Sequence, residues 1–214
     1  MTAPPTSPAD ATAARRTRRD AVENRAGILA AATHAIAHDP HASIDAIARG
    51  AGLSRRALYG HFDDRDTLIR EIVAAGAQRF NAIALAVDDT DARLALARLT
   101  SLLWREAAIV QVAAAIALDE IHVGETADAL APLRRQVLAI VRRGQDERML
   151  RTDVTPHTLA RLVEETARTV VTRMDAASPE ARSLAIRAVL SIAGLSWREA
   201  VDLLDAHPAL LEED

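Results

Sequence analysis

The sequence predicts an all-α protein. Alanine and leucine dominate it, and hydrophobic residues make up 50% of the chain. Apolar residues recur three and four positions apart in one segment after another, which is the spacing of one face of a helix. No alternating run of Val, Ile and Thr is long enough to indicate a strand. We expect an N-terminal three-helix unit followed by a helical bundle.

Residues 1–19 form a segment that we expect to be a disordered basic arm. Three prolines lie among Ala, Thr and Ser, and a composition of this kind does not build a core. Arginines follow at positions 15, 16, 18 and 19. These arginines either belong to a solvated tail or follow phosphates and a minor groove of DNA.

Residues 20–66 have the pattern of three helices, the first over about 20–38. Ile28, Ala32 and Ile36 belong to its apolar stripe, and Pro40 ends it because proline disfavours a helical residue before it. This helix is expected to support the two that follow. Arg25 lies either near the DNA backbone or, as we expect, on the solvated face of this helix.

The segment from Ser43 to Arg65 predicts a helix-turn-helix. Ser43 suits the N-cap of a helix that reaches about residue 51. Gly52 suits the sharp turn, since glycine takes a left-handed conformation without a Cβ penalty. Ser54 suits the N-cap of a second, short helix, whose Leu58 is directed inward to close the angle between the two helices.

The outward residues of the second helix suit DNA. Arg55 and Arg56 are candidates for base contacts, because a guanidinium matches guanine O6 and N7. Hydroxyl, imidazole and guanidinium groups next to them suit phosphate oxygens. The predicted DNA-binding residues are Ser43, Ser54, Arg55, Arg56, Tyr59, His61 and Arg65.

This segment resembles the signature of the tetracycline-repressor (TetR) family of transcriptional regulators. The resemblance implies a homodimer that reads a palindromic operator in double-stranded DNA, a repressor role, and release by a small molecule. Arg56 stands where family members often carry glycine or a small residue, so the operator sequence cannot be taken from relatives. The matching residues are Ile47, Ala48, Ala51, Gly52, Leu53, Ser54, Leu58, Tyr59, His61, Phe62, Arg65, Leu68 and Ile69.

Residues 67–214 are expected to form the ligand-binding and dimerisation domain. A long helix over about 64–87 would link it to the DNA-binding part. The other predicted helices cover about 91–105, 106–119, 126–147, 156–175, 179–193 and 197–204. The last residues, PALLEED, are expected to fray.

Two of these helices are expected to pair with a second copy of the chain. The segment from Met149, MLRTDVTPHTLARLVEE, resembles a stretch that precedes the dimerising helices of the family. The helices over 156–175 and 179–193 also carry more apolar residues than one face can hide. Ordinary burial inside one chain is the alternative.

A ligand site is implied by the same resemblance and by the run 109–118, which is apolar on nearly every face. Such sites are mostly apolar with a few polar groups. Because aromatic residues are scarce, we expect an aliphatic or small ligand. The candidate lining residues are Phe80, Trp104, Gln111, His122 and Thr166, each of which also suits plain core or a helix end.

Other kinds of chemistry find little support. The chain has no cysteine, phosphate-binding glycine loop, GxSxG or HExxH motif. We interpret the cluster of Asp119, Glu120, His122 and Glu125 as a solvated helix end, and expect no metal, no cofactor and no enzyme. Without an apolar signal or membrane segment, we expect a cytoplasmic protein. The alternatives are a DNA-binding dimer without a ligand and, less favoured, an all-α enzyme.

The charge is unevenly distributed along the chain. The net charge is −4; residues 15–70 hold ten Arg and seven acidic residues, whereas the rest holds 16 Arg and 23 acidic residues. An acidic body lowers non-specific affinity for DNA. We therefore expect the DNA-binding helix to act only as part of a pair.

Overall fold

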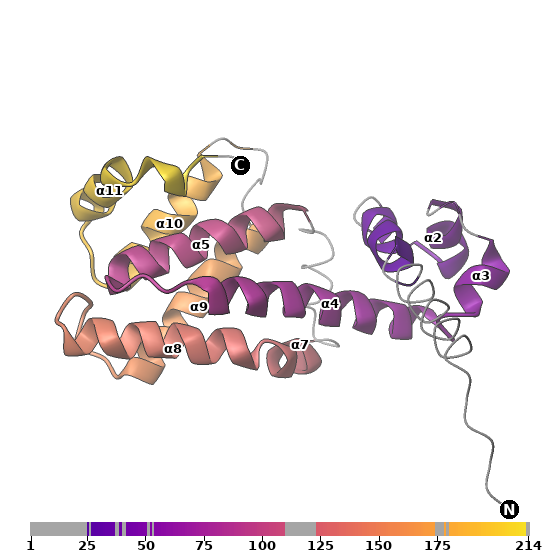
Figure 1. Ribbon diagram of the computed structural model, residues 1–214, viewed down its shortest axis with the longest axis horizontal. Helices are drawn as coiled ribbons and strands as arrows, with labels where there is room; N and C mark the ends of the chain where they lie inside the picture. Colours follow the sequence, from indigo (N-terminus) through magenta and orange to yellow (C-terminus); the bar gives the residue numbers. More distant parts are fainter. Residues whose placement is uncertain are drawn as a thin grey trace, which may run out of the picture. The chain divides into compact units, whose positions relative to one another are not determined.

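The expected all-α fold is confirmed in the part of the chain that the structure describes. The computed structural model describes residues 25, 27–36, 39, 42–50, 52, 54–109, 123–173, 178 and 180–212, and every regular element there is a helix (Figure 1). The chain forms two compact units, Met1–Ile72 and Val73–Asp214. The predicted arm, residues 1–19, lies outside the described residues.

The first unit consists of the helix over 27–36, α2 (Ile44–Gly50), α3 (Arg55–Tyr59) and the first turns of α4 (Arg65–Ala86). Helices as short as α2 and α3 are not stable alone in water. They are held by a shared apolar core, in which a fully buried large side chain contributes about 1.5–3 kcal/mol. The largest contributors are Ile28, Ile36, Ile47, Leu58, Phe62, Leu68 and Ile69.

The second unit is a bundle around α5 (Ala92–Ile109). This helix packs against α8 (Ala131–Asp146) and α10 (Ala181–Ile192), and α9 (Pro156–Arg173) packs against both α8 and α10 (Figure 1). α7 (Val123–Ala129) precedes α8, and α11 (Trp197–Ala206) packs on α10. The core includes Leu96, Leu99, Ile140, Val141, Leu159, Ile186, Val189 and Leu190.

The predicted division between helices over 91–105 and 106–119 is wrong. α5 continues without a break to Ile109. Nothing in the local sequence ends it at residue 105, and Glu106 forms an ion pair with Arg79 of α4. Residues 110–122, which hold most of the second predicted helix, lie outside the described residues.

The single helix predicted over 126–147 is also wrong, because α7 and α8 are separated at Leu130. Pro132 lacks the N–H that a continuous helix would use. Asn81 of α4 satisfies the interrupted backbone: its Nδ2 donates to the Ala129 carbonyl at 2.9 Å, and its Oδ1 accepts from the Leu133 N–H at 3.0 Å. A side chain from α4 thus holds the α7–α8 junction.

The C-terminal segment is ordered at least as far as Leu211, so the prediction that it frays is wrong there. Pro208–Leu210 form a short 3-10 helix, and Leu210 is only 3% exposed. The Ser101 hydroxyl donates to the Leu210 carbonyl at 2.5 Å, and Arg182 donates to the Leu211 carbonyl. The apolar Leu210 and two side chains from distant helices hold this segment.

The apolar surplus predicted on the helices over 156–175 and 179–193 is smaller than expected. Most of it is buried inside one chain, where α9 and α10 pack against each other and against α5. Leu162 and Leu184 stay 37% and 41% exposed. The residues of this set that become buried are Leu159, Val163, Val170, Ile186, Val189 and Leu190.

Gly194→Ala should lower the stability of the second unit by about 1–3 kcal/mol. Gly194 has a φ of +115°, and an added Cβ would lie 2.9 Å from the Arg151 backbone nitrogen. Gly76→Ala is the matched control: its Cβ would meet nothing within 4 Å, so the change should stabilise α4 by about 0.5–1 kcal/mol. Urea unfolding of both variants measures the difference, and equal midpoints would contradict the assignment.

Candidate DNA-binding site

The predicted helix-turn-helix is confirmed as a local structure. The Ser43 hydroxyl caps α2 by accepting the Ala46 N–H at 3.2 Å. Gly52 has a φ of +67°, and its N–H donates to the Arg49 carbonyl at 3.1 Å, which closes the end of α2. The turn therefore uses the one residue type that adopts this conformation without strain.

α3 is fixed at both ends and along its inner side. The Ser54 hydroxyl accepts the Ala57 N–H at 3.1 Å, and the Gly60 N–H donates to the Arg56 carbonyl at 3.0 Å. Leu58 is fully buried, and Phe62 after the helix is 1% exposed. These contacts leave the opposite side of α3 directed to solvent.

α3 and the turn after it carry four of the side chains that were predicted to contact DNA. Arg55 and Arg56 are exposed, Tyr59 is 47% exposed, and His61 is half-buried. Arg55 forms an ion pair with Asp45 of α2, whereas no described residue forms a hydrogen bond or ion pair with the Arg56 side chain. The surface therefore offers two guanidinium groups and a phenol hydroxyl, all of which can donate to base edges or phosphates.

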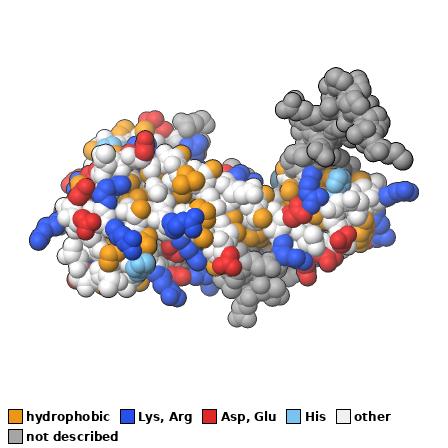
Figure 2. Space-filling model, turned by 60° about the horizontal axis from the view of Figure 1, so that its bottom comes forward, with side chains coloured by type: hydrophobic (Ala, Val, Ile, Leu, Met, Phe, Trp, Pro, Cys, Tyr) orange, Lys and Arg blue, Asp and Glu red, His pale blue; other side chains and the backbone are white. Residues whose placement is uncertain are grey.

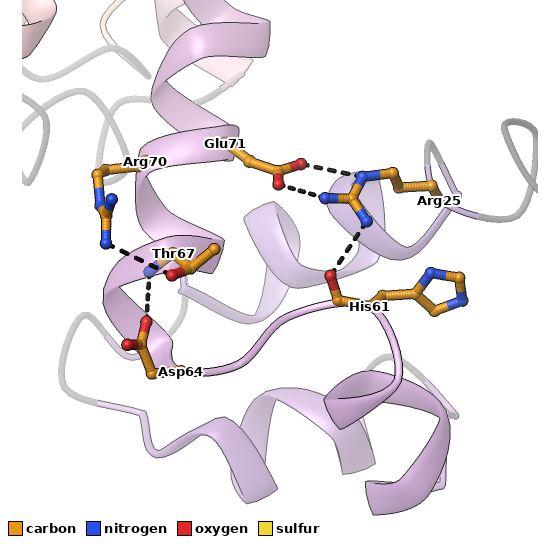
Figure 3. Close-up of polar contacts among 6 residues, drawn as sticks. All are labelled: Arg25, His61, Asp64, Thr67, Arg70 and Glu71. Carbon is orange, nitrogen blue, oxygen red and sulfur yellow. Dashed lines mark hydrogen bonds and ion pairs between the residues drawn. The ribbon is translucent and has the colours of Figure 1, made fainter.

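Arg25 contacts both α4 and the turn that follows α3 (Figure 3). Its Nε donates to Glu71 Oε2 at 3.0 Å, and its Nη2 pairs with Glu71 Oε1. Its Nη1 donates to the His61 carbonyl at 3.0 Å, and the guanidinium lies 4.6 Å from the centre of the Phe62 ring. We call this set of contacts the Arg25 brace; it joins the first helix, the turn after α3, and α4.

The prediction that Arg25 lies on a solvated face was wrong. Its side chain is 38% exposed and that of Glu71 is 33% exposed. The two residues are 46 positions apart, so no helical spacing in the sequence connects them. The only available signal was the presence of an arginine and a glutamate on two helices that must both pack against the helix-turn-helix.

The start of α4 completes the surface. Asp64 Oδ1 accepts the Thr67 N–H at 2.7 Å, and this hydrogen bond is the main cause that lowers the pKa of the Asp64 carboxyl (Figure 3). Arg65 is half-buried, and its Nε donates to the Ala42 carbonyl at 3.1 Å. Arg65 therefore ties α4 to the residue before the Ser43 cap, in addition to its predicted phosphate contact.

Among the described residues, the predicted ligand-binding residues lie in different parts of the second unit. Phe80 packs against the main core of the second unit, whereas Trp104 is buried in a separate cluster with Val170, Ala181 and Ala185. Thr166 is half-buried on α9. The other two candidates, Gln111 and His122, lie outside the described residues.

A cavity of about 350 Å³ lies between α10, α11 and the C-terminal segment. It contains none of the predicted ligand-binding residues. The Nε of Arg187 in its wall is buried without a hydrogen-bond partner among the described residues. The cavity is lined by Glu180, Ser183, Arg187, Val201, Leu204, Asp205 and Leu211.

Outside the helix-turn-helix, the described residues carry charges of both signs but no cluster suited to a metal ion. On the face shown in Figure 2, arginine and carboxylate side chains alternate over the second unit. No group of three His, Asp or Glu side chains suited to a metal ion occurs within the described ranges. Of the cluster predicted at residues 119–125, Asp119, Glu120 and His122 lie outside the described residues, and only the backbone of Glu125 is described. None of the described helices has the length and apolar character needed to cross a bilayer.

Solved structures share the fold of the chain. PfmR from Thermus thermophilus, a TetR family transcriptional regulator, has a TM-score of 0.67 and 22% identity over 79% of this chain and 98% of its own. A putative TetR-family regulator from Rhodococcus sp. has a TM-score of 0.65 and 21% identity over 80% of this chain and all of its own. The fatty acid degradation regulator FadR from Bacillus halodurans has a TM-score of 0.65 and 17% identity, with 78% and 93% coverage.

The helix-turn-helix has its own match in sequence. Residues 28–72 match the family model of bacterial regulatory proteins, tetR family. A comparison with curated proteins finds no significant match. The matched residues contain α2, α3, their caps and the first turns of α4. The helix-turn-helix is thus that of the tetR family of bacterial regulatory proteins, and the chain shares its fold with solved TetR-family transcriptional regulators.

Proposed function

We propose that the chain is a sequence-specific regulator that binds a palindromic operator as a homodimer, acts as a repressor, and is released by a small molecule. The observation that carries this proposal is the outer side of α3. Two arginines and a tyrosine are exposed there on a helix whose caps and buried Leu58 are fixed. A short, rigid, basic surface of this kind suits the major groove.

Each member of the DNA-binding surface has a proposed role. Arg55 and Arg56 contact base edges, and Tyr59 and His61 contact phosphates. The Ser43 and Ser54 hydroxyls accept backbone N–H groups within their own helix starts. A hydroxyl that accepts in this way still has a proton to donate to a phosphate oxygen. Arg65 contacts a phosphate beside the N-terminus of α4, where the helix dipole also favours an anion.

The dimer is proposed to form through the outer faces of α9 and α10. Leu162 and Leu184 are among the few large hydrophobic side chains that stay exposed in the described residues, and they lie on these two helices. Two copies of a helix-turn-helix would read half-sites roughly 34–36 Å apart. A single five-residue reading helix contacts too few bases and phosphates to bind tightly. The second chain of the dimer supplies the remaining contacts with DNA.

The small molecule is proposed to bind in the second unit and to act through α4, which begins in the first unit and ends in the second. A coupling free energy of about 1–3 kcal/mol would change operator affinity five- to hundred-fold. Phe80 and Trp104 pack into separate clusters, so the proposal that a ligand binds is less well supported than the proposal that DNA binds. A constitutive DNA-binding dimer without a ligand is therefore the second candidate, and we propose no catalytic activity for either.

Arg56→Ala should reduce operator affinity by about 1–3 kcal/mol and relax the preference at one base position. The measurement is competition binding to duplexes that carry every single base-pair change of the preferred site. Arg49→Ala is the matched control, since Arg49 is an exposed arginine of the same unit on α2. Uniform weakening of all duplexes by Arg56→Ala would reassign Arg56 to a phosphate.

Arg25→Met should weaken binding to all duplexes by a similar factor and leave base preference nearly unchanged. The change removes the Arg25 brace, so α3 is displaced as a whole, with a loss of about 1 kcal/mol in stability after solvent screening. Arg98→Met removes the Arg98–Asp89 pair in the second unit, whose arginine is as exposed as Arg25, and should leave DNA affinity intact. Equal DNA affinity for Arg25→Met and the native chain would contradict the role of the brace.

Leu162→Glu combined with Leu184→Glu should convert the dimer to a monomer, because the interface would then bury unpaired carboxylates. Sedimentation equilibrium gives the mass, and circular dichroism reports whether the helices persist. Leu85→Glu is the control: Leu85 is 68% exposed and lies on α4. A dimer that persists in the double variant would place the interface elsewhere.

A further inference from the structure

Asp45 and Arg55 connect the two helices of the helix-turn-helix on the side that faces solvent. Asp45 lies in the first turn of α2, and Arg55 is the first residue of α3. Arg55 Nε donates to Asp45 Oδ1, and Arg55 Nη2 pairs with Asp45 Oδ2. One carboxylate therefore holds one guanidinium through two parallel contacts.

The exposure of this pair argues against a role in stability. The Arg55 side chain is 70% exposed and that of Asp45 is 31% exposed. Exposed ion pairs of this kind add little to folding stability, because water and salt screen them. A carboxylate next to a DNA-binding helix also repels phosphates, so its presence lowers general affinity for DNA.

The geometry of the pair leaves one edge of Arg55 open. Asp45 occupies the edge formed by Nε and Nη2. The edge formed by Nη1 and Nη2 keeps N–H groups without a described partner, and these point away from the carboxylate because the guanidinium is planar. Two parallel N–H groups on one edge are what guanine O6 and N7 accept in the major groove.

The neighbouring arginine provides a contrast within the same helix. Arg56 is exposed, and no described residue forms a hydrogen bond or ion pair with its side chain. A long side chain without a partner adapts its rotamer to more than one base or to a phosphate. A side chain held through two contacts presents one orientation before DNA arrives, so less conformational freedom is lost on binding.

We propose that Asp45 is a specificity-determining positioning residue, which orients Arg55 so that its open edge selects guanine at one position of each half-site. The inference rests on the proposed function, since it requires α3 to enter the major groove. Asp45 contributes selectivity in two ways. It fixes the base-reading group, and its charge penalises DNA on which that group makes no base contact.

The test compares full-length Asp45→Asn, Asp45→Ala and Arg55→Ala chains on duplexes with all four base pairs at each half-site position. Asp45→Ala should reduce the preference for guanine about tenfold at one position. Its affinity for an unrelated duplex should not fall, because a negative charge has been removed. Arg55→Ala should lose the same preference for guanine. The double variant Asp45→Ala/Arg55→Ala should lose no more of this preference than Arg55→Ala alone.

Asp153→Asn is the matched control, because Arg151 holds Asp153 through the same two kinds of contact on the surface of the second unit. It should leave base preference unchanged. Melting temperatures of all variants separate misfolding from lost selectivity, and Asp45→Asn keeps the shape of the side chain while weakening its contact with Arg55.

Three results would overturn the inference, and they have different meanings. If Arg55→Ala removes the guanine preference while both Asp45 variants keep it, Asp45 has no positioning role and the proposed function stands. If Arg55→Ala changes no base preference, the proposed base contact by Arg55 is wrong, and the role of Asp45 fails with it. Equal weakening on every duplex by Asp45→Ala would make Asp45 a structural residue only.

Discussion

The guanidinium of Arg25 uses its three nitrogen atoms to join the helix that precedes the helix-turn-helix, the turn that follows α3, and α4. α3 has five residues, too few for a helix that is stable by itself. Its position is therefore set by three sets of contacts: the burial of Leu58, the Ser54 cap at its N-terminus, and the Arg25 brace at the turn that follows it. Recognition of DNA requires such rigidity, because a displaced helix presents its arginines to the wrong bases.

In the second unit, too, contacts between residues far apart in the sequence fix the positions of the helices. Short-range signals begin and end its helices, but side chains from distant helices decide how they join. Asn81 completes the backbone hydrogen bonds at the break before α8, and Ser101 holds the carbonyl of Leu210. α4 contributes to both units, with Glu71 in the brace and Asn81 at the α7–α8 junction.

The sequence predicts best the features that depend on residues only a few positions apart. The caps at Ser43 and Ser54 and the positive φ of Gly52 depend on a few adjacent residues, so they could be inferred locally. The Arg25 brace joins residues 46 positions apart, and no local pattern indicates it. Likewise, apolar periodicity indicates that a face is buried but not whether its partner is the same chain or another, which is why the apolar surplus on α9 and α10 was overestimated.

We propose that two copies of one rigid reading surface recognise DNA together. Selection of bound duplexes from a random-sequence pool by the native chain tests it most directly. We predict an inverted repeat whose half-site centres lie roughly one helical turn, 34–36 Å, apart, bound by two chains. A single unrepeated site bound by one chain, or no enriched sequence at all, would show that the chain does not read DNA as a pair.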